Sequence, residues 1–127
     1  MNAAAFTAIG IGAALGAWGR WLLSVALNPI LPTLPLGTLA ANLIGGYVIG
    51  VAMELLARHA ALPPEVRLFV ITGFLGGLTT FSTFSAEAVT LLGRGQYGWF
   101  AAHVGGHLVG SLCMTVLGIL TVRALVQ

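Results

Sequence analysis

Three stretches of the sequence place polar side chains at helical spacing within otherwise apolar tracts. These residues, each four positions from the next, are Thr38, Asn42, Gly46, Gly50 and Glu54, then Thr79, Thr83 and Glu87, and finally His103, His107 and Ser111. Residues four apart share one face of a helix. Polar groups inside a membrane are costly and commonly mark ion paths. The three rows therefore either meet inside a bundle or line a conduit.

The histidine pair admits two further kinds of chemistry. His103 and His107 could hold a zinc ion, although they supply only two of its ligands. They could also relay protons, because imidazole titrates near neutral pH. Asn42 is suited equally to an interhelical hydrogen bond and to a ligand. No set of nucleophile, base and orienting group can be named, so we expect no enzymatic activity.

The composition indicates a protein whose main solvent is lipid. The chain has 127 residues, of which 58% are hydrophobic and only 6% charged, whereas about a quarter of the residues in a soluble domain are charged. Five basic residues, all arginine and without a basic run, argue against nucleic-acid binding. The single cysteine, Cys113, excludes an internal disulfide.

The apolar tracts predict an all-α membrane protein with one transmembrane domain over residues 1–127. About 20 residues cross a bilayer as a helix, and four tracts of that kind are separated by the breaks NPILPTLP, ALPPEVR and GRGQYG. The expected helices cover approximately residues 3–27, 36–56, 66–92 and 99–122. Four crossings place both termini on the same side of the membrane.

The arginines give almost no preference for one orientation. Arg58, Arg67 and Arg123 fall on the side of the termini, and Arg94 falls on the other, together with Arg20 if it lies near that end. Such a weak positive-inside bias predicts insertion in both orientations and hence an antiparallel, dual-topology homodimer. A random scatter of five arginines could also give this count.

Each apolar tract contains glycines four residues apart. The pairs are Gly12 and Gly16, Gly46 and Gly50, Gly73 and Gly77, and Gly106 and Gly110. Small residues at this spacing let helix backbones approach closely in lipid. We therefore expect a compact bundle, which suits a narrow path better than a roomy cavity.

The third tract contains a helix-weakening stretch, GFLGGLTTFSTFSAE, at residues 73–87. Glycine costs about 1 kcal/mol relative to alanine in a helix, and Gly76 and Gly77 precede Leu78-Thr79-Thr80 near the expected bilayer centre. We predict a break there, with backbone carbonyls freed to bind a cation. Phe81 and Phe84 follow the break; their ring edges could favour an anion, although packing alone would explain their spacing.

Three stretches of the chain closely resemble the fluoride-channel family called Fluc or CrcB. They are GAALGAWGRW, GTLAANLIGGYVIG and TGFLGGLTTFSTFSAE, and the resemblance extends over nearly the whole chain. It implies a dual-topology homodimer in the bacterial inner membrane that exports fluoride passively and so relieves fluoride toxicity. It further implies two pores, each built from both subunits, around a central structural sodium ion.

The same resemblance implies roles for individual residues. The main-chain carbonyls of Gly76 and Thr79 would hold the sodium ion. The residues implied in the fluoride pathway are Arg20, Thr38, Asn42, Phe81, Ser82, Thr83, Phe84, Glu87, His103 and His107. One departure is that His103 and His107 stand where family members commonly have tyrosine and serine. Our hypothesis from this departure is that conduction depends on pH near neutrality, because protonated imidazoles attract an anion more strongly.

Two rival functions remain open at this point. A proton-coupled small multidrug exporter is also short and four-helical, but it needs a carboxylate in the first helix. The first tract has Arg20 and no acidic residue, while Glu87 in the third tract could serve in principle. A non-transporting assembly subunit would need only the glycine packing, and it leaves the TTFSTFS cluster unexplained.

Overall fold

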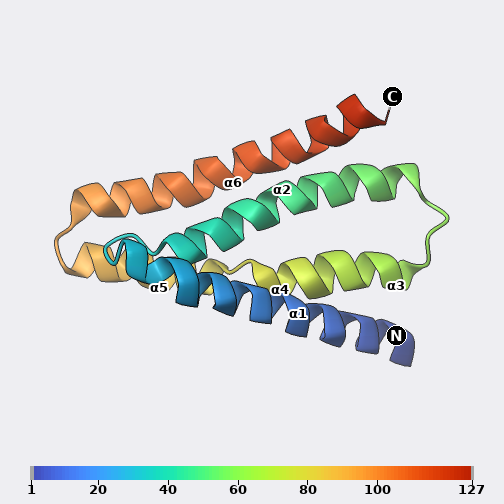
Figure 1. Ribbon diagram of the computed structural model, residues 1–127, viewed down its shortest axis with the longest axis horizontal. Coiled ribbons are helices and arrows are strands. Elements are labelled where there is room, and N and C mark those ends of the chain that lie inside the picture. The colour runs from blue at the N-terminus through green and yellow to red at the C-terminus, as the bar shows by residue number, and fades with distance from the viewer. Residues whose placement is uncertain (1, 127) are drawn as a thin grey trace.

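The protein folds into four long helical spans that run in alternating directions (Figure 1). This computed structural model describes residues 2–126. In chain order, the elements are α1 (Ala3–Leu27), η1 (Asn28–Ile30), α2 (Leu36–Arg58), α3 (Pro64–Arg67), η2 (Leu68–Leu75), α4 (Gly76–Leu78), α5 (Phe81–Gly93) and α6 (Tyr97–Leu125). All four spans are long and apolar enough to cross a membrane. The predicted all-α class with four such helices is confirmed, and both termini lie at one end.

Local sequence signals account for where the spans begin and end. The Asn2 side chain accepts a hydrogen bond from the Ala5 amide at 2.7 Å and so caps α1. Pro64 opens α3, where its fixed φ fits the first helical turn, so the third span begins two residues before the predicted Val66. Gly95, with φ of +71°, makes the tight turn between α5 and α6.

The third span is the irregular one. Its segment η2 has the wider turns of a π-helix and packs against α1. Helical geometry stops at Thr79 and Thr80, which are extended with ψ of 154° and 115°, and α5 begins at Phe81. The helix-weakening stretch of the sequence thus coincides with an interruption in helical hydrogen bonding.

Glycines bring two pairs of spans into backbone contact: α1 with the third span, and α2 with α6. Gly16 of α1 lies against the backbone of Phe74 and Leu78, and α2 packs along α6, where Gly50 lies against the carbonyl of Thr115. Gly118 makes a similar contact with Tyr47 although it lies outside the four predicted pairs. A side chain at any of these glycines would have to displace backbone. Among the paired glycines of the sequence, Gly106 is different because a Cβ added there would meet only the Leu39 side chain, with Cδ1 3.8 Å away.

Burial in this bundle is the reverse of that in a soluble domain. Large apolar side chains such as Phe6 and Leu22 point outward, as expected where lipid is the solvent. The buried polar side chains are Thr38, His103 and His107, at 1%, 1% and 4% exposure. The fold therefore gathers polar groups in its interior, and each must find hydrogen-bond partners or a ligand there.

The glycine contacts predict a matched pair of stability effects on α1. Gly16→Ala adds a methyl group against the backbone of Phe74 and Leu78, and overpacking of this kind costs about 1–3 kcal/mol. Gly10→Ala is the control, because a Cβ there meets nothing within 4 Å and the helix gains up to about 1 kcal/mol in propensity. Thermal unfolding in detergent should show a lower Tm for Gly16→Ala only. Equal melting of the two variants would contradict the close packing of α1 on the third span.

Candidate functional site

The interruption at Thr79 and Thr80 is held by a single side chain from α2. Asn42 Oδ1 accepts a hydrogen bond from the Thr80 amide at 2.8 Å, and Asn42 Nδ2 donates to the Thr80 carbonyl at 3.1 Å. The Thr80 hydroxyl then caps α5 by accepting from the Thr83 amide at 3.2 Å. Asn42 thus replaces the helical partners that Thr80 loses.

The same amide group fixes the proton of a histidine on α6. The backbone of Thr80 sets which side of the Asn42 amide is nitrogen, and this Nδ2 also lies 2.9 Å from His107 Nδ1. Because Nδ2 can only donate, His107 Nδ1 must accept. A neutral His107 therefore carries its proton on Nε2, a buried atom with no hydrogen-bond partner in the part of the chain that the structure describes.

The interruption also releases two backbone carbonyls. In a continuous helix the carbonyls of Gly76 and Thr79 would accept from the amides of Thr80 and Thr83. Those amides bind Asn42 Oδ1 and Thr80 Oγ1 instead. Gly76 and Thr79 both line an open groove. A carbonyl without its helical donor is an oxygen ligand of the kind that hard cations prefer.

Arg20 reaches the same region from α1. Its Nε donates to the carbonyl of Gly77 at 3.0 Å. This contact satisfies an oxygen near the end of α4, where a positive charge is favourable. The side chain is only partly exposed and is bound to backbone.

The groove occupies about 620 Å³ on the face formed by α2, the third span and α6. Most of its lining is apolar, and its polar residues include Asn42, Thr80 and His107. Phe81 and Phe84 also line it, with ring centroids 5.5 Å apart and planes tilted by 59°. The ring of Phe84 lies 4.7 Å from that of His107, so aromatic and polar groups are interleaved at this end of the groove.

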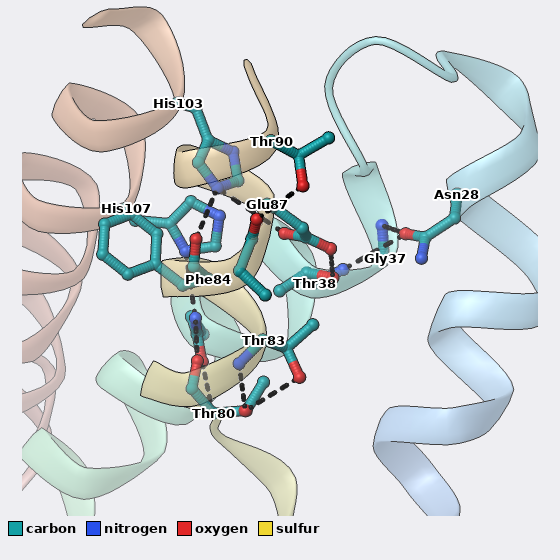
Figure 2. A network of polar contacts seen from close by, with 12 residues as sticks. Asn28, Gly37, Thr38, Thr80, Thr83, Phe84, Glu87, Thr90, His103 and His107 are labelled. Carbon is teal, nitrogen blue, oxygen red and sulfur yellow. Dashed lines mark hydrogen bonds and ion pairs between the residues drawn. The ribbon is translucent and has the colours of Figure 1, made fainter. Parts of the chain in front are cut away.

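A second polar cluster continues from His107 to Thr38 (Figure 2). The ring of His103 lies 4.4 Å from that of His107, and its Nε2 lies 3.3 Å from the Phe84 carbonyl and 3.5 Å from Glu87 Oε1. Glu87 Oε2 accepts a hydrogen bond from the Thr38 hydroxyl at 2.7 Å. The groups form one row, in the order Thr80, Asn42, His107, His103, Glu87 and Thr38.

The structure thus brings together residues from all three rows that were singled out in the sequence. Thr38 and Asn42 come from α2, Glu87 from α5, and the two histidines from α6. Ser82 is exposed and lies 3.4 Å from the Thr80 hydroxyl, which donates to Thr83 at 3.1 Å. Glu54 takes no part in this row, because it binds Arg58 at 3.1 Å and Arg123 at 3.2 Å.

Two residues of this site were not among the predicted site residues. Asn28 Oδ1 accepts from the amides of Gly37 and Thr38 at 2.7 and 3.3 Å and so positions the start of α2. The sequence gives no sign of this contact, since Asn28 belongs to the preceding connection. Thr80 could have been found, because a threonine three residues before Thr83 at a helix start has the spacing of an N-cap.

The cluster also supplies the third ligand that the histidine pair lacked in the sequence. Glu87, His103 and His107 each offer one nitrogen or oxygen atom, and these atoms lie within 4.8 Å of one another. The group is therefore a possible metal-binding site, formed by α5 and α6.

Comparisons with known proteins agree with the resemblance of the sequence motifs. A family model described as "CrcB-like protein, Camphor Resistance (CrcB)" matches residues 7–119. Proteins named "Fluoride-specific ion channel FluC" are similar along their length. The one from Nitrosospira multiformis is 66% identical over 100% of this chain and 99% of its own. Those from Cupriavidus taiwanensis and Ralstonia nicotianae are 59% and 58% identical, each over 98% of this chain and 99% of their own. The protein therefore belongs to the CrcB family.

Proposed function

We propose that this protein is a passive fluoride channel of the bacterial inner membrane, and that it exports fluoride down its gradient. The observation that carries the proposal is the partly buried row of polar groups that links Asn42, at the groove, to Thr38 through His107, His103 and Glu87. The names of the similar proteins support fluoride as the ion. Transport of this kind involves no covalent chemistry, so the protein is not an enzyme.

The groups of the row suit a small anion. The Nε2–H of His107 is a buried donor without a partner in the described residues, and fluoride is a strong hydrogen-bond acceptor. The edges of Phe81 and Phe84 carry partial positive charge and would add weak attraction at the groove. Several weak contacts favour conduction, because a deep charged well would retain the ion.

The groove also supports a second copy of the chain as partner. Phe81 is 79% exposed and lies beside the apolar lining of the groove, so a single subunit leaves its pathway open on one side. In our proposal an antiparallel copy closes it, and two pores form, each from both subunits. The near balance of arginines between the two ends supports insertion in both orientations.

In our proposal a sodium ion binds at the interruption of the third span, which we place near the middle of the membrane. The carbonyls of Gly76 and Thr79 would hold the ion, since their usual helical donors bind elsewhere and both residues line the groove. A bound cation there would neutralise carbonyl dipoles and join the two subunits. The whole chain, residues 1–127, would act as one transmembrane domain.

The first test is ion release from liposomes that contain the purified protein. We expect rapid efflux of fluoride and negligible efflux of chloride. Chloride is larger than fluoride and accepts hydrogen bonds more weakly, so the donors along the row should select against it. Ion-selective electrodes measure both fluxes. Comparable release of the two ions, or release of neither by intact protein, would contradict a fluoride-specific channel.

Two substitutions test the pathway itself. Asn42→Asp removes both donors of the amide, so the contacts to the Thr80 carbonyl and to His107 are lost. Phe81→Ile removes a ring edge from the groove. We expect each to lower fluoride efflux by roughly tenfold or more, with elution from a sizing column unchanged.

Matched control substitutions are available on α1 and its cap. Phe6→Ile makes the same change at a phenylalanine that is 74% exposed. Asn2→Asp keeps a side chain that can still cap α1. Both controls should conduct as the unchanged protein does; an equal loss in controls and test variants would disprove the specific roles of Asn42 and Phe81.

Dual topology can be measured by labelling. Ala61→Cys, combined with Cys113→Ser, places a single thiol in the exposed connection between α2 and α3. A maleimide that cannot cross membranes should label about half of the chains in intact cells, because the arginine bias is weak, and all of them after permeabilisation. Labelling of nearly all or nearly none in intact cells would establish one orientation.

A further inference from the structure

Besides Gln96 Oε1 at the start of α6, three buried polar atoms find no hydrogen-bond partner in the described residues. They are Glu87 Oε1, His103 Nδ1 and His107 Nε2. The three side chains point toward one another (Figure 2). Each offers one nitrogen or oxygen atom, and these three atoms lie within 4.8 Å of one another. Buried polar groups without partners are rare in folded proteins, so this arrangement needs an explanation.

The chemical type of these groups points to a particular class of ligand. Two imidazoles and one carboxylate form a set that binds zinc and similar divalent ions and leaves a fourth coordination position open. Magnesium and calcium prefer all-oxygen sites. We propose that Glu87, His103 and His107 bind a divalent transition-metal ion such as zinc, and that the bound ion blocks the fluoride pathway.

The surrounding structure holds the three side chains in place for such an ion. The Thr38 hydroxyl donates a hydrogen bond to Glu87 Oε2 at 2.7 Å, so Oε1 of the same carboxylate remains available to a metal ion. His103 is stacked on Phe84 at 5.2 Å with planes 19° apart. The two histidines lie one turn apart on α6. His107 also lines the groove, which gives an ion a route to the site.

Metal binding has a cost that sets its expected strength. When Nε2 of His107 binds a metal, the imidazole proton moves to Nδ1. That proton then faces the Asn42 Nδ2 donor, so the present hydrogen bond of 2.9 Å between these two nitrogens is lost. Ligation through Nε2 of His103 would remove its contact with the Phe84 carbonyl at 3.3 Å, whereas ligation through its unpartnered Nδ1 would keep that contact. Each lost hydrogen bond weakens affinity by about tenfold. We therefore expect an exchangeable ion rather than a permanent structural one.

The block follows from the same exchange, and this part rests on the proposed fluoride channel. A metal at this site takes up Nε2 of His107 and one nitrogen of His103, so N–H donors at these atoms no longer face the pathway. In their place stands a cation with an open position, to which fluoride would bind and stay. A deep well of this kind stops conduction.

The binding half is tested with cobalt(II) and the full-length protein in detergent. Cobalt in a four-coordinate N/O site absorbs visible light far more strongly than cobalt in water. The test uses Cys113→Ser protein, because the exposed thiol of Cys113 could itself bind metal. We expect saturable absorption at one cobalt per chain, removed by added zinc and not by magnesium. Absence of this spectrum would overturn the site.

Substitutions assign the ligands. Glu87→Gln, His103→Gln and His107→Ser should each weaken cobalt binding by roughly tenfold or more, since each removes one of three ligands. His59→Gln is the control, because His59 is exposed at the end of α2, where its Nδ1 contacts the Leu55 carbonyl. Undiminished binding in the folded test variants, or loss in the control, would overturn the assignment.

The functional half is tested by fluoride efflux with and without zinc. Micromolar zinc should stop most of the efflux through unchanged protein, while magnesium should not, and His107→Ser protein should lose roughly tenfold in zinc sensitivity relative to its own metal-free flux. Cobalt binding without zinc inhibition would overturn the block and leave the site standing. Absence of fluoride efflux in metal-free protein would instead contradict the proposed channel, and the cobalt spectrum would still decide the metal site.

Discussion

The structure depends on how it satisfies the backbone of Thr80 inside an apolar bundle. In lipid no water replaces a missing helical hydrogen bond, and each unsatisfied backbone group costs several kcal/mol. One amide side chain, Asn42, meets both the N–H and the C=O of this residue. This contact permits the third span to stop and restart, and it leaves the carbonyls of Gly76 and Thr79 available. It also sets the tautomer of His107, so the break and the polar row are one connected arrangement.

Close packing makes the polar row possible. The contacts at Gly16 and Gly50 bring backbones together without intervening side chains, and dispersion holds them because lipid offers no hydrophobic drive between helices. The large apolar residues are then free to face outward. The interior then accommodates Thr38, His103 and His107, which are the most buried polar side chains among the described residues.

Much of this architecture could be predicted from the residues alone. Hydropathy and prolines predicted the four spans, because a bilayer imposes a minimum helix length. Glycine and threonine propensities located the irregular stretch, and four-residue spacing identified the faces that carry Asn42, Glu87 and His107. Periodicity did not identify Asn28, because its hydrogen bond to the Gly37 amide crosses a connection between helices. It also predicted a close backbone contact at Gly106, where a Cβ would have room.

The sequence by itself determined the class of protein, its four spans and the polar face of each helix, since these follow from composition and from contacts between near neighbours in the chain. Only the tertiary structure decided which faces meet. The distance between Glu87 and His103, and the choice of His107 as the partner of Asn42, depend on how α2, α5 and α6 cross. Helix crossings arise from many weak contacts between residues far apart in the chain, and no single spacing records them.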